Sequence, residues 1–164
     1  MGESFLYQAR RKFPRATLRG TVQINVPGQR VTGELMTLSR GGCFVLNIDR
    51  LKVGAEYRMF LLVSSVKNPI ELIGKVLYNL PAMDGHEAGT GFSFTRVSPE
   101  DEAHVEEAVK KSGELYQRLL FALTDSSEDP DEIERLCREA GLPDGLTLAQ
   151  LRWRVVQSVS QFRG

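Results

Sequence analysis

The chain has 164 residues, enough for one domain with a buried core or for one domain with a small helical appendage. Its 21 basic residues balance its 21 acidic residues, which argues against a general binder of DNA or RNA. No stretch approaches the roughly 20 apolar residues of a membrane-spanning helix, and residues 1–11 lack the pattern of a secretory signal. We therefore expect a cytoplasmic protein without membrane insertion.

The basic residues are concentrated near the beginning of the chain. Glu3 is the one acidic residue among the first thirty, where the basic residues are Arg10, Arg11, Lys12, Arg15, Arg19 and Arg30. Residues 100–131 are, by contrast, predominantly acidic. This distribution favours a local anion site over a long nucleic-acid groove.

Six segments have the pattern of short strands. In residues 17–26 apolar and polar side chains alternate with the period of two that is typical of a half-buried strand, and Pro27-Gly28 then provides a turn. The other expected strands cover residues 30–38, 43–48, 56–63, 70–80 and 89–95, with Gly, Pro, Asn and Asp between them. The pattern predicts a six-stranded antiparallel sheet that closes, or nearly closes, into a β-barrel.

A helix is expected directly after the last strand. The segments 57–63 and 70–77 are apolar on nearly both faces, so we expect this helix to cover their outer faces. Ser98-Pro99-Glu100-Asp101 offers an N-cap, a proline at the first helical position and early acidic residues. Apolar residues at helical spacing continue to Thr124.

Two further helices are predicted after this closing helix. Asp129-Pro130 begins one that ends before Gly141, and Thr147 with Gln150 forms a capping box for the other. The last helix carries a stripe of Leu148, Leu151, Val155, Val159 and Phe162. The stripe either packs on the neighbouring helices or docks a partner, including a second subunit in a homodimer. The fold class is thus mainly β with an α extension, divided into residues 1–124 and 125–164.

The sequence contains few groups suited to catalysis. His86 lies in a Gly-rich turn and His104 on an acidic helix, and neither has the spacing of a metal ligand. Gly41-Gly42 leads into a strand and not into a helix, which argues against a nucleotide-binding fold with a phosphate loop. We expect no enzyme activity, no catalytic residue, no metal and no cofactor, and we expect Cys43 and Cys137 to be reduced.

The segment 10–15, Arg-Arg-Lys-Phe-Pro-Arg, is the strongest candidate for ligand binding. Arginines four residues apart, on a chain stiffened by Pro14, can converge on one anion. The planar guanidinium binds phosphate oxygens in pairs and stacks on a flat base. Taken alone the segment is ambiguous, because charge runs near a terminus are usually solvated.

A second element in the sequence favours ligand binding by this segment. Arg11-x-x-x-Arg15, followed by a strand hairpin and then by Ser39-x-x-Gly42, resembles the two-part signature of the PilZ domain. This family of cyclic di-GMP receptors has a six-stranded antiparallel barrel with a closing helix. The resemblance covers roughly residues 5–123 and extends to the strand start at Gly42-Cys43-Phe44-Val45.

The resemblance implies roles for individual residues. Arg11 and Arg15 would wrap over cyclic di-GMP, gripping its phosphates and stacking on guanine, with Arg10 as an additional contact. Ser39 would line the ligand on the barrel surface, and Gly42 would let the backbone approach it closely.

One position departs from the family pattern. Thr37 stands where the family usually has Asp or Asn, and a threonine hydroxyl is a poorer partner for a guanine edge. The loss of one good polar contact costs about 1–3 kcal/mol, which is roughly 5- to 150-fold in affinity.

Three functions remain open on the sequence alone. The first is a cyclic di-GMP effector that signals to an unidentified protein partner in motility, polarity or envelope processes. The second is a PilZ-like adaptor that has lost the ligand and acts through protein–protein contacts. The third, binding of single-stranded nucleic acid, needs exposed aromatic residues, whereas Phe44, Phe60, Phe92 and Phe94 are expected in the core.

Overall fold

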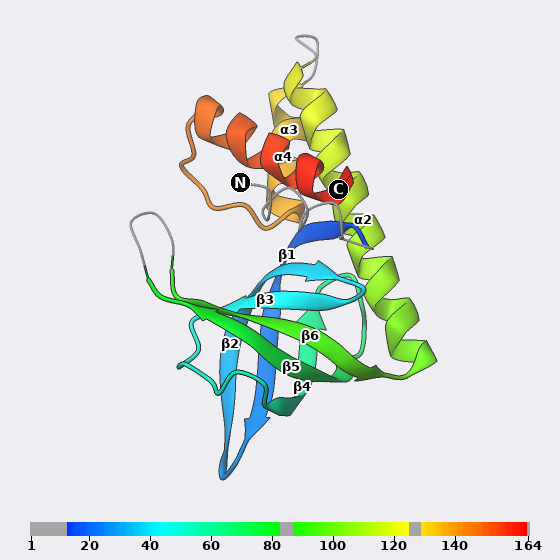
Figure 1. The fold of residues 1–164 in the computed structure, drawn as a ribbon. Coiled ribbons are helices and arrows are strands. Elements are labelled where there is room, and N and C mark those ends of the chain that lie inside the picture. Colours follow the sequence, from blue (N-terminus) through cyan, green and yellow to red (C-terminus); the bar gives the residue numbers. More distant parts are fainter. Residues whose placement is uncertain (1–12, 83–86, 125–128, 164) are drawn as a thin grey trace, which may run out of the picture.

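A computed structural model gives the fold and describes residues 13–82, 87–124 and 129–163 (Figure 1). Six strands form a closed barrel in the order β1-β2-β3-β6-β5-β4, with every neighbouring pair antiparallel. The strands are β1 (Arg15–Val26), β2 (Gln29–Ser39), β3 (Gly42–Leu46), β4 (Glu56–Val63), β5 (Ile70–Leu80) and β6 (Gly89–Val97). The helices in the described part are α2 (Pro99–Thr124), α3 (Pro130–Glu139) and α4 (Leu148–Arg163). The predicted fold class is confirmed.

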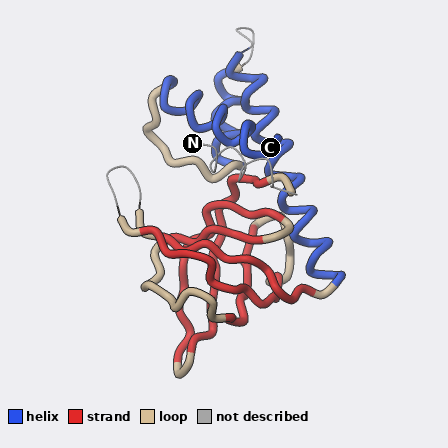
Figure 2. Tube along the Cα trace, viewed as in Figure 1, coloured by secondary structure: helices blue, strands red, loops and turns tan. Residues whose placement is uncertain are grey.

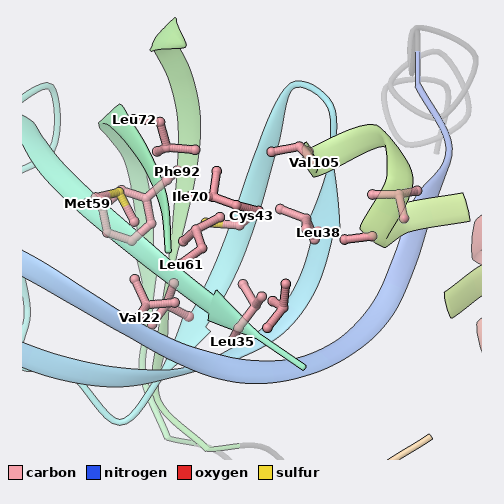
Figure 3. Packing of buried hydrophobic residues seen from close by; sticks show 14 of the residues in the cluster. Val22, Leu35, Leu38, Cys43, Met59, Leu61, Ile70, Leu72, Phe92 and Val105 are labelled. Atoms are coloured by element: carbon pink, nitrogen blue, oxygen red, sulfur yellow. The ribbon is translucent and has the colours of Figure 1, made fainter. Parts of the chain in front are cut away.

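The barrel encloses the main hydrophobic core. Apolar residues at alternate strand positions point toward one another inside it, as Figure 3 shows for residues such as Val22, Leu61 and Phe92. Val105, Ala108 and Val109 of α2 belong to the same buried cluster. The first half of α2 therefore completes the barrel core.

The local signals at the helix ends act as predicted. The Ser98 side chain accepts a hydrogen bond from the Asp101 amide (3.1 Å) at the start of α2. Thr147 and Gln150 bond each other reciprocally at 2.9 and 3.1 Å before α4. Gly141 takes a φ of +73° directly after α3, a conformation in which glycine lacks the usual Cβ strain.

One prediction about α2 is wrong. Its main contacts with the barrel are to β1, β2 and β5, and it does not cover the outer faces of β4 and β5 as a layer. Leu62, Leu77 and Leu80 on those faces are 38%, 45% and 49% exposed. The first half of α2 instead places its apolar side chains in the barrel core, and its second half extends beyond the barrel, as the tube in Figure 2 shows.

The second half of α2 builds a separate core with α3 and α4. We call this assembly, α3, α4 and the part of α2 from Tyr116 onward, the helical unit. Its buried side chains are Tyr116, Leu119, Ala122, Leu123, Leu136, Val155 and Val159. The long helix α2 thus contributes to both cores and connects them.

The apolar stripe of α4 packs within the chain. Val155 and Val159 are buried in the helical unit, and Leu151 is partly buried against them. The Phe162 ring lies on Gly113 of α2 and leaves no room for a Cβ atom there. The stripe therefore packs on its neighbours, whereas Leu148 at its beginning stays exposed.

Two adjacent valines of α4 test this packing. Val155 is fully buried and Val156 is 46% exposed. We expect Val155→Ala to lower the free energy of unfolding by roughly 1–3 kcal/mol, because it leaves a cavity in the helical unit. Val156→Ala is the matched control and should stay within about 0.5 kcal/mol of the unsubstituted protein. Urea unfolding measures both, and equal effects would contradict the packing.

Candidate functional site

Strand pairing brings the separated motif residues into one row. Arg15 of β1 lies opposite Ser39 of β2, and Ser39 lies opposite Gly42 of β3. Gly42 in turn lies opposite Ser93 of β6. Residues from three distant parts of the sequence therefore lie side by side on the barrel.

A second row runs parallel to the first, two residues away from it on each of the first three strands. Thr17 lies opposite Thr37, Thr37 opposite Phe44, and Phe44 opposite Gly91, which in turn pairs with Tyr78. Residues two apart on a strand share a face of the sheet. Because the intervening Ala16, Leu38 and Cys43 are buried in the core, both rows lie on the outer face of the barrel.

The turn between β2 and β3 is held by its own side chains. The Ser39 hydroxyl accepts a hydrogen bond from the Gly41 amide (3.3 Å) and donates one to the Gly42 carbonyl (3.4 Å). Arg40 forms ion pairs with Glu102 and Glu106 of α2. The turn is therefore tied to the closing helix.

Phe13 lies on the same turn. The Arg40 guanidinium carbon is 5.2 Å from the centre of the Phe13 ring, a cation–π distance, and the ring also lies against Gly41. Phe13 is two residues before Arg15. The chain segment that enters β1 is therefore anchored beside the Ser39–Gly42 turn.

Gly42 has a structural reason to be glycine. A Cβ atom at this position would collide with the Phe92 carbonyl oxygen of β6. The absence of a side chain thus allows β3 and β6 to pair closely. A role of Gly42 in the approach of a ligand remains a prediction.

An aromatic surface lies beside the two rows. The rings of Phe44 and Tyr78 have centroids 6.2 Å apart and planes inclined by 29°. Gly89 and Gly91 of β6 lie beneath them, and neither has room for a Cβ atom next to these rings. We call Phe44 and Tyr78 the aromatic platform.

The prediction that Phe44 belongs to the core is therefore wrong, as is that for Phe60, which lies outside the core beneath Arg30. Phe92 is buried as predicted, and Phe94 is partly buried against the core. Phe44 alternates with the inward-facing Cys43 and Val45, which places its ring outside. The glycines two residues apart in β6 are the sequence signal that could have identified the platform.

A cleft of about 700 Å³ lies between this barrel face and the helical unit. Its barrel side includes Arg15, Thr17, Thr37, Phe44, Tyr78 and Leu80, and its helical side includes Tyr116, Leu142 and Arg154. A smaller pocket of about 410 Å³ shares Arg15, Thr37 and the platform and adds Ser39 and Gly42. The larger volume falls within the range of roughly 300–1,000 Å³ that is typical of ligand sites.

The structure thus brings four of the six candidate residues together. Arg15, Thr37, Ser39 and Gly42 line one continuous surface, in which Thr37 is only 8% exposed. Arg10 and Arg11 lie outside the described residues. The cleft residues missed by sequence reasoning are the platform with Arg19, Tyr116 and Arg154.

The chemistry of the cleft suits a ligand with negative charge and flat rings. Its lining includes three cations, from Arg15, Arg19 and Arg154, and two carboxylates, from Glu34 and Glu87. Burial raises the pKa of the Tyr116 hydroxyl, which therefore stays protonated at neutral pH. Guanidinium groups bind phosphates, and aromatic rings stack on bases.

Other reactive groups are few in the part of the chain that the structure describes. No group of three or more His, Cys, Asp or Glu residues there is placed to hold a metal ion. Cys43 and Cys137 are free thiols, and burial raises the pKa of both, which makes them poor nucleophiles. None of the described helices is long and apolar enough to cross a membrane.

A sequence model of the PilZ domain matches residues 9–111 of the chain. This match includes the two rows and the β2–β3 turn, and it ends within α2. A comparison with curated proteins gave no match.

Several solved structures share the fold at low sequence identity. The PilZ domain of YcgR from Escherichia coli, with c-di-GMP, has 15% identity and a TM-score of 0.51, with coverage of 64% of this chain and 92% of that one. The Bacillus subtilis inhibitor of motility MotI/DgrA has 17% identity and a TM-score of 0.55, with coverage of 62% and 51%. K. pneumonia MrkH has 16% identity and a TM-score of 0.57, with coverage of 66% and 52%. The chain therefore spans about half the length of MotI/DgrA and MrkH.

The contact between Gly42 and β6 can be tested with neighbouring glycines. We expect Gly42→Ala to destabilise the fold by about 1–3 kcal/mol, because the new methyl group meets the Phe92 carbonyl and cannot be accommodated without a shift of the backbone. Gly41→Ala is the matched control, since its Cβ would lie at an ordinary 3.4 Å from the Phe13 ring. Thermal denaturation compares the two, and an unchanged midpoint for Gly42→Ala would contradict the close pairing.

Proposed function

The chain belongs to the PilZ domain family, and from this membership we propose that it is a cyclic di-GMP receptor that signals the level of this second messenger to a partner protein. The observation that carries the proposal is the row of Arg15, Ser39 and Gly42 on the barrel face. It supports the proposal because these three residues of the PilZ-like signature lie side by side there, beside a cleft of suitable size.

The proposed ligand matches the chemistry of this surface. Cyclic di-GMP carries two phosphates and two flat guanines. Arg15 would bind a phosphate through its planar fork, with Arg11 and Arg10 as further cations. The aromatic platform offers a flat apolar face beside Arg15, on which a guanine can stack.

Thr37 has a defined place in this proposal. It lies between Thr17 and Phe44 across the strands and lines both pockets. Its hydroxyl would give the guanine edge one rotating partner where Asp or Asn would give a fixed planar acceptor. We therefore expect a receptor of reduced affinity.

We propose that the partner of this receptor is a protein and not DNA. The formal net charge of zero gives the molecule no general attraction for a polyanion.

An adaptor without a ligand is the second candidate, and one observation favours it. The Ser39 hydroxyl already bonds to two backbone groups of its own turn, so the turn does not depend on a ligand for its structure. In this alternative the barrel serves only as a scaffold for the helical unit.

Titration calorimetry with cyclic di-GMP tests the receptor directly. We expect saturable binding by the unsubstituted chain and a loss of roughly 10- to 150-fold in Arg15→Ala, because a hydrogen-bonded charge pair is lost. Arg50→Ala, an exposed arginine outside the cleft lining, is the control and should bind normally. The absence of heat with the unsubstituted chain would favour the adaptor.

Replacement of Thr37 tests the departure from the family pattern. We expect Thr37→Asn to tighten cyclic di-GMP binding by roughly 5- to 150-fold, because an amide restores a planar acceptor and donor at the guanine edge. Thr32→Asn places the same change at an exposed position of β2 and should have no effect. Unchanged or weaker binding in Thr37→Asn would contradict the assigned place of Thr37.

A further inference from the structure

The cleft has a second wall that the barrel does not supply. Tyr116 of α2, Leu142 of the α3–α4 connection and Arg154 of α4 line it, facing the barrel side with Arg15 and Arg19. We propose that Arg19 and Arg154 form a second anion position that binds a phosphate group of the ligand. The ligand would then contact the barrel and the helical unit together. Its identity as cyclic di-GMP rests on the proposed function.

Two hydrogen bonds at Thr17 hold the helical wall of the cleft against the barrel wall. The Ser112 hydroxyl of α2 donates to the Thr17 carbonyl (2.5 Å), and the Ser158 hydroxyl of α4 donates to the Thr17 hydroxyl (2.9 Å). One residue of β1 therefore ties both helices to the barrel. The position of α4 beside β1 is set by a specific contact as well as by apolar packing.

The hydrogen bond between Ser158 and Thr17 also brings Arg19 and Arg154 to the same cleft. Arg154 is four residues before Ser158, so the two share a face of α4. Arg19 is two residues after Thr17, and both of these β1 residues line the cleft. The two arginines therefore flank the Ser158–Thr17 hydrogen bond.

Arg19 itself spans the gap between the barrel and the helical unit. Its aliphatic stem lies against Gly141, with Cδ 3.3 Å from the position that a Cβ would take there. Gly141 ends α3 with a positive φ. The aliphatic stem thus packs at the helix end, and Arg19 also lines the cleft.

The positive charges of Arg19 and Arg154 both affect the pKa of the Tyr116 hydroxyl. Burial raises the pKa of the Tyr116 hydroxyl, and a hydrogen bond with Ser158 and the positive charges of Arg19 and Arg154 oppose that rise. Both guanidinium groups thus act on one buried hydroxyl. Two cations near the same point provide an electrostatic site for an anion.

Arg19 and Arg154 take part in none of the ion pairs between described residues. Arg118, Arg135 and Arg138 of the helical unit form ion pairs with glutamates. Neither Arg19 nor Arg154 has a described carboxylate within 4 Å, although Glu34 and Glu87 also line the cleft. The Glu34 carboxylate instead accepts a hydrogen bond from Asn47 (2.8 Å). An anionic ligand would supply the missing counter-charge.

A cyclic dinucleotide carries two phosphates, one for each anion position. In this proposal one phosphate would meet Arg15 while the other meets Arg19 and Arg154. Binding would then stabilise the docking of α4 on the barrel, because a ligand stabilises the state that it contacts. The helical unit would sense the ligand directly.

Calorimetric titration with cyclic di-GMP tests the second position with neighbouring arginines. Arg154→Ala should weaken binding roughly tenfold or more, through loss of a charged hydrogen bond. Arg152→Ala, exposed on the same helix but outside the cleft lining, should bind like the unsubstituted chain. Arg154→Lys should recover only part of the affinity, because it keeps the charge and loses the planar fork.

The outcomes separate this inference from the proposed function. Binding that depends on Arg15 but is equal in Arg154→Ala and Arg152→Ala would overturn the second position and leave the receptor intact. An absence of binding by the unsubstituted chain would overturn both. Unfolding midpoints without ligand should coincide for the Arg154 and Arg152 variants, because both side chains are exposed. A lowered midpoint for Arg154→Ala alone would assign Arg154 a structural role and contradict the inference.

Discussion

Strand β1 pairs with β2 along one edge and with β4 along the other, and this pairing both closes the barrel and aligns the candidate site. It places Arg15 opposite Ser39 and Thr17 opposite Thr37. A shift of the strand register by one residue would turn these side chains toward the core. The packing of the apolar inner face therefore also keeps the outer-face residues in register. Through Thr17 the same strand also carries the hydrogen bonds to α2 and α4. The cleft exists because one strand belongs to both the barrel and the contact with the helices.

Much of this arrangement was predictable from local patterns in the sequence. Alternating apolar residues, or short apolar runs between turn residues, located all six strands, because a barrel has one dry face and tight turns join its strands. Ser98 and Thr147 marked the beginnings of helices because their side chains accept hydrogen bonds from backbone amides of the first turn. Gly141 marked a helix end because glycine adopts a positive φ without strain. The motif residues were recognised from their spacing, and strand pairing explains how that spacing produces one surface.

Other features depend on contacts between distant segments and left little trace in the sequence. Phe44 was placed in the core because its segment is apolar, yet its ring packs outside over Gly89. The outer faces of β4 and β5 were assigned to a helix because local hydrophobicity does not specify which face is covered. Arg19 and Arg154 are far apart in the chain, and only the docking of α4 on β1 brings them to one cleft. The spacing of residues in the sequence does not predict that two such distant side chains line the same cleft.

The central claim is that ligand binding involves both walls of the cleft, and hydrogen–deuterium exchange with and without cyclic di-GMP tests it most directly. The account predicts slower exchange on the barrel wall, in residues 36–46 and 77–81, and also on the helical wall, in residues 140–158. Exchange of backbone amides reports local opening, so protection of both walls would mean that the ligand stabilises their contact. Protection confined to the barrel wall, or no protection at all, would contradict the account.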